Sequence, residues 1–166
     1  MYKRGFTLIE LITVISVISV LAVVLIVLVN PLGQFQKTWD GERKSDLFQI
    51  QKSLEAYYAD HGSYPSSAGN IINDANGAHN FGSSGWSYMD VIPNDPSAPT
   101  KKYVYYSPAD GQSYGLYASL DRGNQDSQVC NSGNACTTLF NAIGNNANTA
   151  CGGVCNYGVS SPNASP

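Results

Sequence analysis

A single carboxylate interrupts the apolar stretch near the start of the chain. Residues 6–29 contain one charged side chain, Glu10, among 24 positions. An ionisable group in a membrane-length segment costs about 2.5–3.5 kcal/mol to insert, so it indicates a functional role. Cleavage of the Gly5–Phe6 bond would give Phe6 a free α-amine one helical turn before Glu10, at i,i+4 spacing. We therefore expect an amine–carboxylate pair, within one chain or between two chains packed side by side.

The stretch that carries Glu10 is long enough to form a membrane-spanning helix. At about 1.5 Å per residue, residues 6–29 cross a hydrocarbon core of roughly 30 Å. Lys3 and Arg4 precede it and favour a cytoplasmic N-terminus, which would place the rest of the chain outside. A secretory signal peptide is a poor alternative, because the apolar run is too long and residues 30–33 offer no small-residue cleavage site. A plain signal anchor explains the apolar run and its basic flank, but not the glycine or the carboxylate.

One run of residues resembles the N-terminal signal of type IV pilins and type II secretion pseudopilins: Lys3-Arg4-Gly5-Phe6-Thr7-Leu8-Ile9-Glu10-Leu11. That signal has a short basic leader, a Gly, a Phe, and a Glu four residues after the Phe. The resemblance implies cleavage after Gly5 by a prepilin peptidase, N-methylation of Phe6, and a role for Glu10 in filament assembly. It implies three kinds of partner: other pilin subunits, the prepilin peptidase/methyltransferase, and an inner-membrane assembly platform.

The chain divides into a leader (residues 1–5), a transmembrane and assembly helix (6–29) and one exported domain (30–166). The exported part is long enough for a single core. A formal net charge of −3, with 13% charged residues, gives no electrostatic footprint for nucleic acid, so no nucleic-acid partner is expected. We predict an α+β fold, in which a long helix kinked near Pro31 packs on a small antiparallel sheet beside a disulfide-bonded C-terminal loop region.

A second helical pattern runs from about residue 35 to about residue 60. Pro31 favours a kink or a short melted turn at 30–33, and Gly62 can form the left-handed cap at the far end. One face of this helix is apolar, and it carries Leu47, Ile50, Leu54, Tyr57 and Tyr58. The polar positions are expected to face solvent or neighbouring subunits: Lys44, Asp46, Gln49, Lys52 and Glu55. The helix exit, Asp60-His61-Gly62-Ser63-Tyr64-Pro65, resembles the corresponding exit in pseudopilins.

The remainder of the chain has one clear β signal. Residues 61–101 are rich in Gly, Ser, Asn and Pro, and are expected to form a variable connection with one short helix near 86–91. Aromatic and alternating residues predict a β-hairpin over 103–120, with the helix as its partner. A third strand is expected without a definite position, and one helical turn is expected near 139–143.

Four cysteines lie in the C-terminal region, residues 121–166: Cys130, Cys136, Cys151 and Cys155. An even number of cysteines in an exported segment favours two disulfides, and three pairings are possible. The C-x5-C and C-x3-C spacings fit zinc sites poorly. Free thiols remain the alternative for a host without an oxidising exterior.

Oxygen-bearing side chains follow the predicted hairpin directly. Asp121, Asn124 and Asp126 surround a glycine and could hold Ca²⁺, and the resemblance to calcium-binding major pseudopilins supports this. The alternative is an ordinary polar turn, because the run is short and contains Arg122. His61 and His79 are expected to be solvated. No nucleophile or phosphate-binding motif is present, so enzymatic activity is not expected.

The resemblance implies a structural function. The chain would be a subunit of a type IV pilus or a type II secretion pseudopilus. Its precursor would be a single-pass membrane protein with its N-terminus inside, and the mature chain would join an extracellular pilus or a periplasm-spanning pseudopilus. The alternative function is that of a membrane-anchored minor pilin, acting as an adhesin or a DNA-uptake binding module.

Overall fold

The computed structural model describes residues 5–166 and contains two compact units. One ends at Gln36 and the other comprises Lys37–Pro166, which we call the head. Most of the predicted leader therefore lies outside the described residues. The predicted α+β fold is confirmed by a long N-terminal helix, small antiparallel sheets and two disulfides near the C-terminus.

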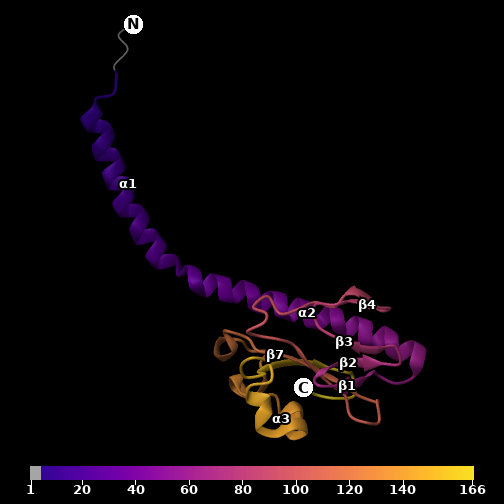
Figure 1. Ribbon diagram of the computed structural model, residues 1–166. Helices are drawn as coiled ribbons and strands as arrows, with labels where there is room; N and C mark the ends of the chain where they lie inside the picture. Colours follow the sequence, from indigo (N-terminus) through magenta and orange to yellow (C-terminus); the bar gives the residue numbers. More distant parts are fainter. Residues whose placement is uncertain (1–4) are drawn as a thin grey trace. The chain divides into compact units, whose positions relative to one another are not determined.

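The long helical region is interrupted at one residue. Helix α1 spans Leu8–Val29 and helix α2 spans Pro31–His61 (Figure 1). Asn30 between them adopts a left-handed conformation, with φ 46° and ψ 71°. Its Oδ1 accepts a hydrogen bond of 3.3 Å from the backbone N–H of Gly33, and thereby caps α2. Pro31 occupies the first helical position, where its missing N–H costs nothing. The kink or short melted turn predicted at 30–33 is confined to Asn30, the one non-helical residue of that segment.

Helix α2 carries the apolar face that the sequence predicts. Leu47, Ile50, Leu54 and Tyr57 are buried in the main core of the head. The helix ends at His61, and Gly62 follows with φ 70°, its N–H donating to Tyr58 O at 2.8 Å. The glycine is therefore needed for the left-handed cap.

Three strands form the central sheet of the head. Strand β6 (Val104–Tyr106) pairs with β7 (Gly115–Ala118), and β7 pairs with β8 (Tyr157–Ser160), all antiparallel. The first pair lies within the predicted hairpin, and β8 is the third strand that the sequence did not place. Every residue of β7 is buried, because β7 is the middle strand and is covered on both faces.

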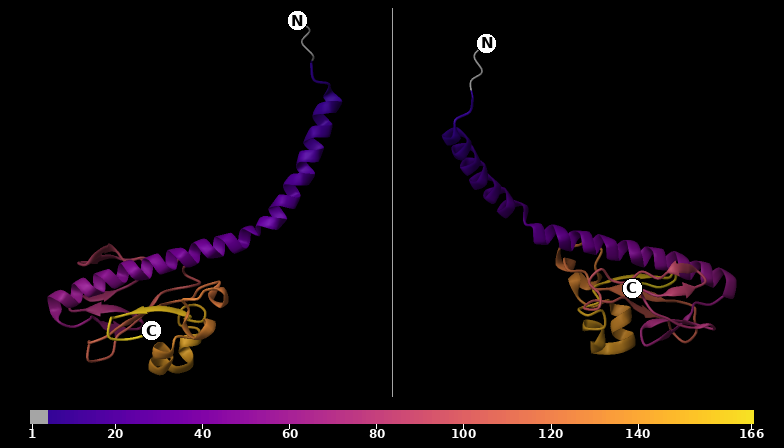
Figure 2. Two further views of the ribbon diagram at one scale, coloured as in Figure 1. Left: turned by 180° about the vertical axis from the view of Figure 1, so that it is seen from behind. Right: turned by 45° about the horizontal axis from the view of Figure 1, so that its top comes forward.

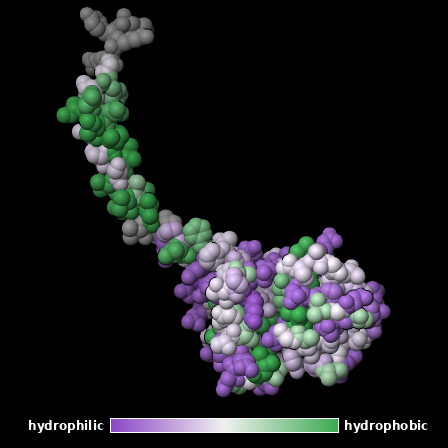
Figure 3. Space-filling view, in the orientation of Figure 1, coloured by the Kyte–Doolittle hydropathy of each residue, from purple (hydrophilic) through white to green (hydrophobic). Residues whose placement is uncertain are grey.

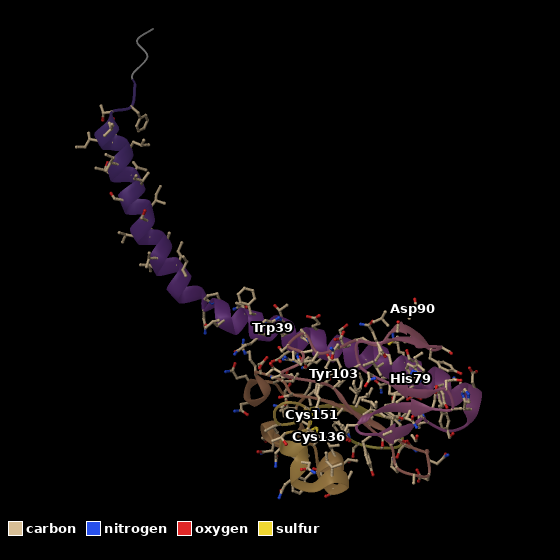
Figure 4. All side chains as sticks on the ribbon, viewed as in Figure 1. Trp39, His79, Asp90, Tyr103, Cys136 and Cys151 are labelled. Carbon is tan, nitrogen blue, oxygen red and sulfur yellow. A yellow bond between two sulfur atoms is a disulfide. The ribbon has the colours of Figure 1, made fainter. Side chains whose placement is uncertain are left out.

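The two faces of this sheet contact different layers. Tyr103, Tyr105 and Leu116 join the α2 face in one core, whereas Val104 and Tyr117 join the C-terminal region in a second. Both views in Figure 2 show α2 on one side of the strands and α3 (Thr137–Ile143) on the other. Figure 4 labels Tyr103 beside α2, and Cys136 and Cys151 in the C-terminal layer. The head is therefore a three-layer domain with helix, sheet and disulfide-bonded loops.

The segment between α2 and the central sheet is more regular than a variable connection. Strands β1 (Ser66–Ala68), β2 (Ile71–Asp74) and β3 (Gly77–His79) form one antiparallel sheet. Strands β4 (Ser84–Trp86) and β5 (Met89–Val91) form a hairpin. The predicted short helix near 86–91 is therefore wrong.

The histidine prediction needs correction for one of the two residues. His79 is 9% exposed, and its Nε2 lies 3.0 Å from Asp74 Oδ1 across the β2–β3 hairpin. Buried polar rings need a partner, and the turn of the hairpin brings Asp74 to it. His61 is exposed at the end of α2, where its ring stacks on Tyr57.

Two disulfides close short loops in the C-terminal layer. Cys130 bonds to Cys136, and Cys151 bonds to Cys155. Three of the four cysteines are fully buried beside Leu139, and Cys130 packs against them. Each closed loop is small, so each bond is worth about 2 kcal/mol in the chain-entropy estimate. The structure thus selects one of the three pairings that the sequence left open.

Candidate functional site

Helix α1 presents apolar side chains on all sides. Its large apolar residues from Leu8 to Ile26 are 48–76% exposed within the chain, and Figure 3 shows the helix as mostly apolar surface with paler patches between. The stretch from Leu8 to Ile26 is long and apolar enough to span a membrane. A helix that is apolar all round must be covered by lipid or by other helices.

Glu10 lies in the first turn of α1 and is part of a capping box. Thr7 is the N-cap residue, and its Oγ1 accepts a hydrogen bond of 3.3 Å from the Glu10 backbone N–H. In return, Glu10 Oε2 accepts from the Thr7 backbone N–H at 3.0 Å and from its hydroxyl at 2.8 Å. These bonds use one carboxylate oxygen and two donors of the N-cap residue. They start the helix, but they supply no positive charge to the carboxylate.

The peptide bond predicted to be cut lies just ahead of this cap. Gly5 and Phe6 are exposed and precede the first helical residue, Leu8. A protease needs an extended, accessible backbone, which residues outside a helix provide. The same cleavage would create the α-amine of Phe6 within one turn of Glu10. This end of the chain therefore combines an accessible bond, a new cation and a carboxylate.

A buried arginine forms the second notable constellation, in the head. Arg43 of α2 is fully buried, and all five of its N–H groups have acceptors. Its Nε and Nη2 donate to the two oxygens of Asp95, at 2.8 and 3.1 Å. Its Nη1 donates to Asp40 and Asp121, both at 2.8 Å, and Nη2 also donates to Ser97 at 2.9 Å. We call this set the Arg43 cluster.

The Arg43 cluster joins one helix to two loops. Asp40 Oδ1 and Oδ2 also accept from the backbone N–H groups of Asp121 and Arg122, at 2.8 and 2.9 Å. Burial alone would lower the pKa of Arg43, but the hydrogen bonds and charges of Asp95 and Asp121 outweigh it and raise that pKa. The guanidinium is therefore permanently charged, and it fixes the loop that follows β7.

The three residues predicted to hold calcium have other roles here. Asp121 accepts from Arg43 and from Lys101 Nζ, the latter at 2.5 Å. Asp126 pairs with Lys44 Nζ at 2.5 Å. Asn124 is exposed in the 3₁₀ turn Gly123–Gln125. Within residues 5–166, no three acidic, histidine or cysteine side chains form a metal-binding group. In this arrangement Ca²⁺ could bind only by displacing Lys101 from Asp121 and Lys44 from Asp126.

The prediction that polar α2 residues face solvent or neighbouring subunits is wrong at three positions. Lys44 is part of the Asp126 ion pair, and Asp46 accepts from the Tyr103 hydroxyl at 2.7 Å. Glu55 accepts from two tyrosine hydroxyls, those of Tyr64 and Tyr114, both at 2.9 Å. These groups are half-buried, because the loops and strands of the head supply partners for them. Gln49 and Lys52 are exposed as predicted.

Two protein-family models match this chain. One, described as the prokaryotic N-terminal methylation motif, matches residues 1–26. The other, described as type II secretion system (T2SS), protein G, matches residues 30–134, which is more than half of the chain. The chain belongs to the type IV pilin and pseudopilin family. Comparisons with curated proteins and with solved structures gave no match.

Membership of the pilin and pseudopilin family gives the two constellations different roles. Subunits of this family assemble into filaments and are processed by a prepilin peptidase, and Gly5, Phe6 and Glu10 lie within the part matched by the N-terminal methylation motif. The Arg43 cluster lies in the part matched by the protein G family and holds the pilin head together. Sequence reasoning missed Arg43, although it precedes Leu47 by one turn on the apolar face of the helix.

Loss of the Lys44–Asp126 pair should make pilin stability less sensitive to acid. Hydrogen bonding to Lys44 lowers the pKa of Asp126, despite some burial. A lowered carboxylate pKa adds stability above the unfolded value of about 3.9, and this stability is lost as the pH falls through the folded value. We expect Asp126→Asn to lower the free energy of unfolding near neutral pH, and to approach the wild type as the pH falls through the folded pKa of Asp126. Urea unfolding of both proteins across pH tests this, and a pH-independent difference would contradict it.

Calcium should have no effect on the fold of this pilin head. We expect isothermal titration calorimetry of the full chain in detergent to give no binding heat with Ca²⁺, because Asp121 and Asp126 already pair with cations. A chelator should leave the thermal midpoint unchanged. Heat that disappears in Asp121→Ala would show that calcium displaces the lysines, and would restore the calcium prediction.

Proposed function

We propose that this chain is the repeating structural subunit of a type IV pilus or pseudopilus filament, exported and assembled after cleavage between Gly5 and Phe6. One observation carries the proposal. Glu10 is the only charged residue in helix α1, which is apolar and exposed. Among residues 5–166, the only hydrogen-bond partner of its carboxylate is the neutral Thr7. An uncompensated carboxylate in an apolar environment costs several kcal/mol. In this proposal a cationic group of another subunit neutralises the Glu10 carboxylate in the assembled filament.

The assembly mechanism follows from that cost. The precursor lies in the membrane, with lipid covering α1. Cleavage creates the Phe6 amine, and the Glu10 carboxylate of one subunit pairs with the amine of its neighbour as the apolar helices bundle. Bundling keeps the side chains from Leu8 to Ile26 out of water without lipid, and burial of each large one is worth about 1.5–3 kcal/mol relative to water. The ion pair sets the axial position of each subunit, because only one register joins the two charges.

The subunit has no catalytic role in this proposal, and its destination is a filament outside the inner membrane. The exposed helix and the intact head have separate tasks, since α1 builds the shaft and the head forms its surface. The apolar surface of α1 and the match to the protein G family support this division.

Electron microscopy of the sheared cell-surface fraction tests the proposal. Cells expressing the chain with a prepilin peptidase and an assembly platform should yield filaments that bind antibodies to the head along their length. A Gly5→Leu variant, which blocks the cut, should leave the precursor in the membrane and yield no filaments. Antibody labelling only at filament tips would contradict the repeating role, and abundant filaments from Gly5→Leu would contradict the processing step.

A further inference from the structure

A pocket of about 370 Å³ lies in the head, where several short segments meet. Its wall is formed by the β1–β2 turn, the β3–β4 connection, Asn94 in the loop after β5 and the residues just before β6. Its volume falls within the range of about 300–1,000 Å³ that small-molecule sites occupy. The assembly mechanism proposed above involves α1 and Glu10, and it assigns no role to this pocket.

Several residues that line the pocket carry polar side-chain groups without protein partners. The ammonium of Lys102 forms no ion pair or hydrogen bond within residues 5–166, and the same holds for the side-chain amides of Asn70 and Asn80. Asn94 Oδ1 accepts from the backbone N–H of Asp95 at 3.0 Å, which leaves its NH₂ group available. Each free amide offers two donors and an acceptor. The residues that line the pocket therefore carry one cation and three amide groups.

The aromatic part of the wall is held rigidly. Phe81 is half-buried and contacts Tyr103 edge to face, with ring centroids 5.7 Å apart. Tyr103 is in turn fixed by its hydrogen bond to Asp46. Gly82 follows with φ 84°, and a Cβ there would come within 3.2 Å of the Asn94 amide. The backbone thus brings an apolar ring and a polar amide to adjacent places in the pocket.

We propose that this pocket binds an acidic monosaccharide of the uronic acid class. The Lys102 ammonium pairs with the sugar carboxylate, which is a charge-assisted interaction. The amides of Asn70, Asn80 and Asn94 exchange hydrogen bonds with ring hydroxyls, which both donate and accept. Phe81 contacts the apolar C–H face of the sugar ring. The pocket volume accommodates one such ring with its bound water.

Other ligand classes fit this chemistry less well. A nucleotide or a polyphosphate needs several cations, and the pocket offers only Lys102 among the residues that line it. A purely apolar ligand would leave three amides and an ammonium desolvated without partners, which costs about 1–3 kcal/mol per group. A neutral sugar satisfies the amides but not the ammonium. The carboxylate is therefore the feature that the pocket selects.

Saturation-transfer NMR with the full chain in detergent micelles tests the proposal, with glucuronate and glucose as the two probes. We expect glucuronate to bind at least about tenfold more tightly than glucose, which corresponds to one interaction of about 1.4 kcal/mol. Lys102→Gln should abolish that preference, and Asn80→Ala should weaken both sugars. Lys52→Gln is the matched control, because Lys52 is exposed on α2 with its ammonium 4.5 Å from the Phe48 ring.

Three results would overturn the proposal. These are no saturation transfer to either sugar, equal binding of glucuronate and glucose, or a loss of the glucuronate preference in the Lys52→Gln control as large as in Lys102→Gln. Each variant changes an exposed residue, so we expect all of them to fold. A thermal midpoint equal to that of the wild type checks this for each variant. The result is independent of filament assembly, which depends on Glu10 and is measured on the same variants.

Discussion

We expect Glu10→Gln to leave the precursor in the membrane and to lower the yield of filaments at least about tenfold. An amide oxygen can still accept from Thr7, so the start of α1 is preserved. The charge is lost, however, and the Phe6 ammonium of the neighbouring subunit then lies unpaired among apolar helices. That costs several kcal/mol, and each 1.4 kcal/mol changes an equilibrium constant tenfold. The yield is measured as sheared protein relative to the membrane pool.

Two control variants separate pairing from capping. Thr7→Val removes the hydroxyl of the capping box but keeps the carboxylate, so filaments should still form. Glu42→Gln removes a carboxylate from an exposed position on α2 and should have no effect. Normal assembly by Glu10→Gln, together with failure of Thr7→Val, would show that Glu10 acts only as a helix cap.

The largest expected loss of stability comes from Arg43→Met. Removing the guanidinium leaves Asp40 and Asp95 buried without their cation, and a broken buried ion pair costs about 3–5 kcal/mol. Arg43→Lys keeps the charge but cannot supply five donors in a fork, so its loss should be intermediate. Urea unfolding of the full chain in detergent measures both, with fluorescence of the buried Trp86 as a reporter.

A control variant and a double variant test whether the loss in Arg43→Met comes from the unpaired buried carboxylates. Lys52→Met removes a cation from the exposed side of the same helix and should cost about 1 kcal/mol at most. Adding Asp95→Asn to Arg43→Met should recover part of the loss, because it removes an unpaired buried charge. If Arg43→Met is no less stable than Lys52→Met, the Arg43 cluster does not hold the head together.

Local patterns in the sequence were sufficient for the elements that pack through apolar periodicity. Leu47, Ile50 and Leu54 recur at helical spacing and are all buried. The alternating tyrosines around 103–120 form β6 and β7, as their pattern indicates. The strand β8 could not be placed, because it is only four residues long and pairs with a strand almost forty residues earlier.

The Arg43 cluster was missed for a related reason. Its acceptors lie in distant segments, with Asp95 and Asp121 placed 52 and 78 residues after the arginine. A charged residue on a helix is normally solvated, so only its position on the apolar face and the Asp40 spacing pointed inward. The same long-range contacts redirected the carboxylates that were predicted to bind calcium. The sequence shows which side chains carry oxygen ligands, but it does not show which distant lysines and arginines the fold brings next to them.

Mass spectrometry of the sheared filament fraction tests the central claim most directly. We predict a dominant chain that starts at N-methylated Phe6 and carries two disulfides, Cys130–Cys136 and Cys151–Cys155. Absence of the chain from that fraction, with only an uncleaved form starting at Met1 in the membrane, would contradict its role as a processed filament subunit.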